Sequence, residues 1–213
     1  MRVALVQLAA GIDPAANLDA VLRLTQDVEA DLIVLPEAVM CDFGLPEMRL
    51  GPVAQPLDGP FVTALAAIAR DHSAGVVAGM FERSDDPERP YNTLVALAPD
   101  GSLAGIYRKT HLYDSFGYRE SDRLTAGPAE PVVVSFGDRR LGLMTCYDLR
   151  FPEQARALVD AGSDVLVVPV SAVSKGRVKV RESGKDAWRD VVVGKSDGEL
   201  VEIRQGLKEG DLV

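Results

Sequence analysis

Short apolar runs alternate with amphipathic segments through the first 173 residues of the chain. The runs predict buried strands at 2–8, 31–35 and 164–170, and another strand at 75–81. The spacing of apolar residues predicts helices at 13–29, 61–72 and 152–161. Two paired runs flank glycine-containing turns and predict hairpins, 91–98 with 102–107 and 131–136 with 140–145. This alternation favours an α/β layered fold with both sheet faces covered.

The pattern changes after residue 173. All 13 prolines precede that point. Residues 1–173 carry 14 basic and 24 acidic side chains, a balance of −10, whereas 174–213 carry 9 and 8, a balance of +1. In the tail, the sequence predicts short strands at 177–181, 187–193 and 200–204, with turns at 196–198 and 206–211. We therefore expect two domains, an α/β body over 1–173 and a small β-rich tail over 174–213.

Composition narrows the classes of partner. A net charge of −9 argues against nucleic acid and against an anionic membrane surface. Two cysteines make neither a disulfide framework nor a zinc site, so we expect no metal and a reducing, cytoplasmic setting. The N-terminus is too short for a signal peptide, and no apolar run approaches the roughly 18 residues of a membrane span.

Three candidate functional residues follow predicted strands: Glu37, Lys109 and Cys146. The ends of strands in one sheet system can converge, and such a trio suits thiol acyl transfer. Glu37 would take the thiol proton, and Lys109 would stabilise the developing oxyanion. Cys146 stands at a turn before Pro152, where a helix start is expected to favour the thiolate. The backbone N–H of Tyr147 could be a second oxyanion donor.

Each of these residues has a structural alternative. Cys146 could be a small buried hydrophobe, an interpretation that fits Cys41 better because no helix start follows it. Glu37 could cap a helix, and Lys109 could be a solvated surface lysine. His111 could form a Cys–His dyad with Cys146, but it lies in a loop and could equally support the residues that contact substrate.

These residues together, in their order along the chain, are a more specific signal of function than any one of them alone. The body resembles the nitrilase, or carbon–nitrogen hydrolase, superfamily, and the matching segments are VALVQL (3–8), DLIVLPE (31–37), YRKTHLYD (107–114), FGYRE (116–120) with Gly127 after it, and TCYDLRFPE (145–153). The resemblance implies Glu37 as general base, Lys109 as oxyanion stabiliser and Cys146 as nucleophile, with Glu120 positioning the lysine. It also implies substrate-positioning or supporting roles for Tyr113, Tyr147 and Arg150.

The resemblance carries further expectations. The residues around Cys146 resemble those of the family branch that hydrolyses small aliphatic amides, similar to ω-amidase and deaminated-glutathione amidase. It implies no organic cofactor and a homo-oligomer. Family members continue past this body, so we expect an incomplete α-β-β-α sandwich followed by a β-hairpin tail.

The tail resembles the membrane-proximal β domain of periplasmic efflux adaptors, at VVVG (191–194), GELVEI (198–203) and GLKEGD (206–211). That second likeness suggests a chimera. An alternative to the amidase is therefore an inactive nitrilase-like protein that acts by binding through its β module.

Overall fold

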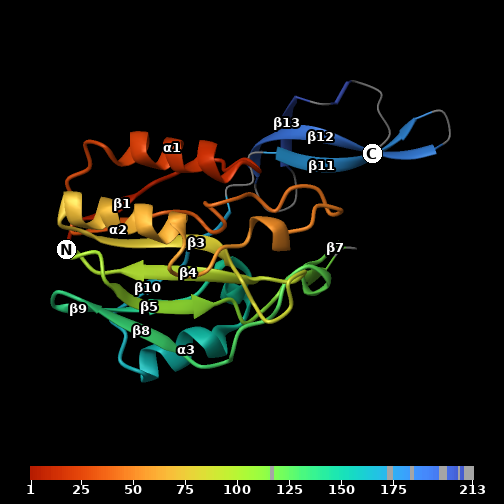
Figure 1. Ribbon diagram of the computed structural model, residues 1–213. Coiled ribbons are helices and arrows are strands. Elements are labelled where there is room, and N and C mark those ends of the chain that lie inside the picture. The colour runs from red at the N-terminus through yellow and green to blue at the C-terminus, as the bar shows by residue number, and fades with distance from the viewer. Residues whose placement is uncertain (116–117, 172–174, 183–184, 197–200, 206, 209–213) are drawn as a thin grey trace. The chain divides into compact units, whose positions relative to one another are not determined.

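The computed structural model describes residues 1–115, 118–171, 175–182, 185–196, 201–205 and 207–208 (Figure 1). The chain divides into two compact units, Met1–Ser171 and Ala172–Val213. Each unit is described by itself below.

The first unit contains two sheets that carry most of its core. One has five strands in the order β1 (Val3–Leu5), β2 (Leu32–Val34), β3 (Gly75–Glu82), β4 (Tyr91–Leu97) and β5 (Leu103–Arg108). Its first three strands are parallel and its last three antiparallel. The other sheet has the order β10 (Val165–Val167), β9 (Arg139–Leu143) and β8 (Val132–Phe136), with β10 parallel and β8 antiparallel to β9.

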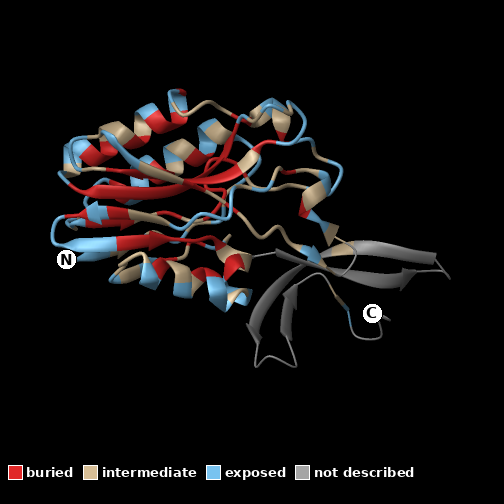
Figure 2. Cartoon of the chain, turned by 90° about the horizontal axis from the view of Figure 1, so that it is seen from below, coloured by how far each residue is buried: buried red, intermediate tan, exposed pale blue. Residues whose placement is uncertain are grey.

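Three helices form the outer layers of this unit (Figure 1). Helices α1 (Pro14–Thr25) and α2 (Pro60–His72) bury apolar residues against the five-stranded sheet, and α3 (Pro152–Asp160) packs against β9. A second apolar cluster fills the space between the two sheets, with Leu94 and Tyr107 from one side and Leu141 and Leu143 from the other. The predicted α/β layered fold is thereby confirmed, and Figure 2 shows the buried residues gathered in the central strands.

Local sequence explains where the helices begin. Each of the three starts on a proline, whose fixed φ suits the first helical position. The side chain of Asp13 caps α1 by accepting the N–H of Ala15 at 2.9 Å. The predicted helix 13–29 ends early, at Thr25. Asp27 and Glu29 follow, and acidic side chains are unfavourable at the negative end of a helix dipole.

The prediction that both sheet faces are covered is wrong at one edge. The outer strands β1 and β10 are short, and the side chains of Leu5 and Leu166 are 78% and 37% exposed. An open groove of about 340 Å³ lies there, lined by Met1, Val3, Leu5, Leu32, Val34 and residues 165–168. An outer strand has a neighbour on one side only, so an apolar run does not guarantee burial.

The second unit is an antiparallel sheet of β11 (Lys175–Glu182), β12 (Lys185–Ser196) and β13 (Val201–Gln205). The β12–β13 pairing has register shifts after Val192 and Val193. These strands correspond to the three predicted in the tail. The predicted turns fall at least partly on residues 197–200, 206 and 209–213, which lie outside the described residues. The tail's separate origin and its likeness to an efflux adaptor stay predictions.

Across the described ranges, no helix combines the length and the apolar character needed to cross a membrane.

Candidate active site

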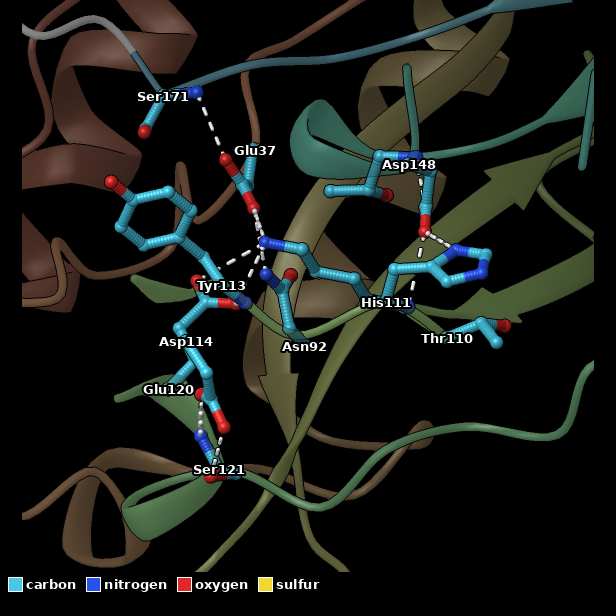
Figure 3. A network of polar contacts seen from close by, with 12 residues as sticks. Glu37, Asn92, Thr110, His111, Tyr113, Asp114, Glu120, Ser121, Asp148 and Ser171 are labelled. Carbon is cyan, nitrogen blue, oxygen red and sulfur yellow. Dashed lines mark hydrogen bonds and ion pairs between the residues drawn. The ribbon is translucent and has the colours of Figure 1, made fainter. Parts of the chain in front are cut away.

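Four polar side chains from separate segments meet at one end of the sheets in the first unit. Glu37 follows β2, Lys109 follows β5, Glu120 opens the 3₁₀ turn η2 (Glu120–Asp122), and Cys146 opens η3 (Cys146–Arg150). Figure 3 shows the carboxylates of Glu37 and Glu120 converging on the same cluster. The structure therefore brings together the four residues that the sequence singled out. Residues 116–117 of the predicted FGYRE segment lie outside the described residues.

The turn that carries Glu37 is pressed against β3. Ala38 has a φ of +51°, which is unusual for a residue other than glycine. The N–H of Gly79 donates to the carbonyl of Pro36 at 3.1 Å. A Cβ atom at Gly79 would lie 2.4 Å from the nitrogen of Ala38 and 2.8 Å from the Cα of Glu37. Only glycine at position 79 lets the turn approach so closely.

The Glu37 side chain is 2% exposed and fully engaged. Its Oε1 accepts hydrogen bonds from Asn92 Nδ2 at 2.8 Å and from Lys109 Nζ at 3.1 Å. Its Oε2 accepts the backbone N–H of Ser171 at 3.1 Å. The charge of this carboxylate raises the pKa of the Cys146 thiol, so the two groups are neighbours. Glu37 is therefore fixed in place beside the thiol whose proton it could accept.

Lys109 lies between two carboxylates and is 1% exposed. Its Nζ is 3.1 Å from Glu37 Oε1 and 2.9 and 3.1 Å from the two oxygens of Glu120. Burial alone lowers the pKa of Lys109, but the charges of Glu37 and Glu120 outweigh it and raise the pKa above its ordinary value. An ammonium has three hydrogens, so if one is shared by both Glu120 oxygens, one is left for a substrate oxygen.

Glu120 is held by the loop that precedes it. Its Oε2 accepts the N–H of Tyr113 at 2.7 Å, and its own N–H donates to the Tyr113 carbonyl at 3.0 Å. Burial raises the pKa of Glu120 against the opposing influence of Lys109. The Tyr113 ring lies 4.9 Å from the Tyr147 ring in an edge-to-face contact, and Tyr147 contacts Phe151 at 5.5 Å in the same manner. These rings form an aromatic row beside the polar cluster.

Cys146 is the first residue of η3, and its φ of +45° strains the backbone at this position. Its N–H donates to the Pro169 carbonyl at 3.0 Å, which ties the turn to the segment after β10. Burial, then the charge of Glu37, raise the pKa of the thiol to about 12, and Lys109 opposes them only in part.

The prediction that a helix start favours the thiolate is therefore wrong. The helix next to Cys146 is only the short turn η3, and α3 begins at Pro152. One ammonium faces two carboxylates, so ionising the thiol would add a further negative charge to the cluster. At rest, Cys146 is a neutral thiol with the Glu37 carboxylate beside it.

Asp148 is a residue of the site that the sequence reasoning did not single out. It is fully buried and accepts hydrogen bonds from Tyr107, His111 and Thr145. A signal was present, because Thr145 and Asp148 have the spacing of a capping box. Asn92 was also missed, and its only sequence signal was an amide in an otherwise apolar strand.

The structure also shows where the other candidate residues, His111, Arg150 and Cys41, lie. His111 bonds to Asp148 and stacks on Phe151 with ring centroids 3.8 Å apart, so it lies beside Asp148 rather than beside Glu37 or Glu120 (Figure 3). Arg150 is exposed, and within the described part of the chain its side chain has no hydrogen bond or ion pair. Cys41 is buried, with its thiol 3.4 Å from the Ile12 carbonyl, and burial raises its pKa to about 11.

Among the described residues, no group of three or more His, Cys, Asp or Glu side chains is arranged to hold a metal ion.

Residues 2–195 match the carbon-nitrogen hydrolase family, and the chain belongs to that family. The nitrilase-superfamily membership expected from the sequence is thus confirmed.

Relatives of the chain share its sequence over most of its length. A hydrolase of Mycobacterium tuberculosis is 42% identical over 176 residues, which cover 80% of this chain and 61% of that protein. The deaminated glutathione amidase of Escherichia coli O157:H7 is 36% identical over 145 residues, or 68% of this chain and 55% of the enzyme. The chain thus spans about 60% of the length of curated relatives that it matches.

A solved structure shares the fold and contains an active-site cysteine. It is a variant of the amidase from Nesterenkonia sp. AN1 that shows Michael addition of acrylamide at that cysteine. It has a TM-score of 0.64 and 28% identity, and it covers 80% of this chain and 66% of its own.

Proposed function

We propose that this chain is an amidase-type hydrolase that cleaves small aliphatic amides through a thioester on Cys146. The observation that carries the proposal is the position of Glu37, which accepts a hydrogen bond from the Lys109 ammonium at 3.1 Å and raises the pKa of the Cys146 thiol. Nucleophile, base and cation are thus close enough to act on one another. Family membership and the active-site cysteine of the Nesterenkonia amidase support it.

In the first half-reaction, the Cys146 sulfur attacks the amide carbonyl carbon while its proton passes to Glu37. A thiol that is neutral at rest needs such a base, because the thiolate is the reactive form. The carbonyl oxygen becomes an oxyanion, and Lys109 stabilises it with its remaining hydrogen. Protonated Glu37 then gives its proton to the departing nitrogen. The C–N bond breaks, ammonia leaves, and a thioester remains.

In the second half-reaction, Glu37 takes a proton from a water molecule as that water attacks the thioester carbonyl. Lys109 again faces the oxyanion. The C–S bond breaks, the sulfur recovers the proton from Glu37, and the carboxylic acid leaves. Throughout, Glu120 holds Lys109 against the loop at Tyr113. Each proton that Glu37 accepts is returned, so the cycle needs no other reactant than the amide and water.

The substrate class rests on the relatives. The name of the Escherichia coli relative and the Nesterenkonia structure both designate amidases, which supports an amide substrate over a nitrile. The aromatic row of Tyr113, Tyr147 and Phe151 would contact the acyl part of the substrate.

Ammonia release from a panel of small ω-amides tests this proposal. Wild-type protein should release ammonia, and Cys146→Ser should lower the rate by at least about 10³-fold, because a serine hydroxyl is a far weaker nucleophile here. Cys41→Ser is the matched control and should keep the wild-type rate. Equal rates in wild type and Cys146→Ser would refute the assignment. A folded wild-type protein that releases no ammonia would favour the binding-protein alternative.

A further inference from the structure

The buried carboxylate of Asp148 accepts four hydrogen bonds, two on each oxygen. Its Oδ2 accepts the N–H of Thr145 at 2.8 Å and the hydroxyl of Tyr107 at 2.7 Å. Its Oδ1 accepts the N–H and the Nδ1 of His111 at 3.1 and 2.8 Å. A carboxylate offers about four acceptor positions, and here all of them are used.

The donors lie on either side of the two reacting groups. Tyr107 and His111 flank Lys109, each two residues away, and Thr145 directly precedes Cys146. The backbone of Lys109 lies between these anchors and is also bonded to Asn92. One buried carboxylate therefore connects the strand end that carries the ammonium to the turn that carries the thiol (Figure 3).

We propose that Asp148 is a positioning residue that sets the distance between the Cys146 thiol and the Glu37–Lys109 pair, with His111 as its supporting partner. The inference rests on the proposed amidase function for its kinetic consequence, but its geometric consequence is independent of that function.

The chemistry of the four donors explains why only a carboxylate serves. On each oxygen, one donor is a backbone N–H, from Thr145 or His111, and a backbone N–H cannot become an acceptor. The other donor on each oxygen can reverse, because a hydroxyl rotates and a histidine can change tautomer. An asparagine amide at position 148 would place its NH₂ group against a backbone N–H in either orientation. Both orientations leave a buried donor unpaired.

The surroundings keep these donors in place. The His111 ring stacks on Phe151 at 3.8 Å with an interplanar angle of 8°, and the N–H of Phe151 donates to the carbonyl of Asp148 at 2.9 Å. Burial, together with the charge of Asp148, raises the pKa of Tyr107, so its hydroxyl stays protonated as a donor. The contact between the two segments is therefore fixed by packing as well as by charge.

The first test is Asp148→Asn, with Glu82→Gln as the matched control. Glu82 is also a buried carboxylate that accepts three side-chain hydrogen bonds, from Thr93 and Arg108, and it has no part in the site. We expect kcat for amide hydrolysis to fall by about 10²-fold in Asp148→Asn with KM nearly unchanged, because a displaced nucleophile loses near-attack geometry. In Glu82→Gln, both constants should stay near wild type even if the protein is less stable.

A second readout needs no substrate. In a Cys41→Ser background, the thiolate fraction of Cys146 at mildly alkaline pH is measured by ultraviolet absorbance, with Cys146→Ser as the blank. Asp148→Asn should raise this fraction, because the thiol moves away from the negative charge of Glu37, and Glu82→Gln should leave it unchanged. If wild type hydrolyses no amide, the proposed function fails, but this comparison still decides the role of Asp148.

A double variant covers the case in which Asp148→Asn does not fold. Tyr107→Phe with His111→Phe keeps an aromatic ring at both positions and the stacking on Phe151. It removes one hydrogen-bond donor from each carboxylate oxygen of Asp148. It should show the same two changes, smaller in size. A folded Asp148→Asn, or a folded double variant, with wild-type kcat and wild-type thiolate fraction would overturn the proposal.

Discussion

In the proposed mechanism, the Cys146 thiol is activated by a neighbouring base rather than by a low pKa. Its pKa is raised to about 12 by burial and then by Glu37, so almost all of it is protonated at neutral pH. Lys109 stays charged because the two carboxylates beside it raise its pKa. In the proposed mechanism, the cation is therefore available to stabilise the oxyanion, and the negative charge on sulfur develops only as the proton moves to Glu37.

This arrangement makes an unusual prediction for Glu37→Gln. Removing the negative charge should lower the pKa of the Cys146 thiol, because the charge of Glu37 raises it. The thiolate fraction at mildly alkaline pH should therefore rise above that of wild type. Amide turnover should nevertheless fall by about 10²–10⁴-fold, because no base remains for the leaving nitrogen or the water.

Glu82→Gln is the control for this measurement, since Glu82 is buried elsewhere in the sheet. A Glu37→Gln variant whose thiol ionises less readily than that of wild type would contradict the account of the cluster.

At the scale of single residues, sequence reasoning named Glu37, Lys109 and Cys146 because each follows an apolar run. It could not find their supporting contacts. Asn92 reaches Glu37 across 55 positions of sequence, and Ser171 does so across 134. Such contacts depend on which strands pair and which turns lie next to each other, and a local sequence pattern cannot predict this. The error over the thiolate has the same origin, since the charge beside Cys146 comes from a distant segment.

At the scale of elements, the site depends on how closely the turn after β2 approaches β3. Gly79 permits that approach, and Ala38 accepts a strained backbone next to Glu37. The turn is also bonded to β3 through Met40, whose N–H donates to the Gly79 carbonyl at 3.3 Å. Glu37 is therefore positioned by main-chain contacts with a buried strand, which are more rigid than contacts with a loop.

Gly79→Ala should therefore displace Glu37 without changing any polar residue. We expect turnover to fall by about 10-fold or more, because a misplacement of 1 Å can cost this much. Stability should fall by about 1–3 kcal/mol through overpacking, measured by urea unfolding. Gly11→Ala is a matched control, because a Cβ there would meet nothing closer than 3.7 Å. Wild-type turnover in Gly79→Ala would show that the turn tolerates the extra methyl group.

Element boundaries show a similar limit on prediction. The three helix starts follow from proline, whose local geometry is readable in the sequence. The exposure of β1 and β10 is not readable, because burial depends on which strand lies beside each in the sheet. The hydrophobic run at 2–8 therefore gave the right type of element but the wrong degree of burial.

At the scale of the whole molecule, the open edge of the two sheets is the main departure from a closed sandwich. Leu5 is 78% exposed and Val170 is 49% exposed, and a groove of about 340 Å³ lies between β1 and β10. Exposed apolar edges of this kind favour association. The chain also spans only about 60% of the length of the relatives it matches.

We therefore propose that the chain self-associates, as its resemblance to the family implies. Light scattering should give a mass above the 22.8 kDa of one chain, and the thermal midpoint should rise with protein concentration, because association stabilises the folded state by mass action. A monomeric mass together with a midpoint independent of concentration would contradict this expectation.

The central claim is that hydrolysis passes through a thioester on Cys146, and trapping that intermediate tests it most directly. Turnover of an active ω-amide is quenched with acid, and the intact mass and peptide masses of the protein are measured. The account predicts an added acyl group on the peptide that contains Cys146, present in wild type and Cys41→Ser and absent in Cys146→Ala. Steady ammonia release with no acyl group on Cys146, or undiminished release by Cys146→Ala, would contradict it.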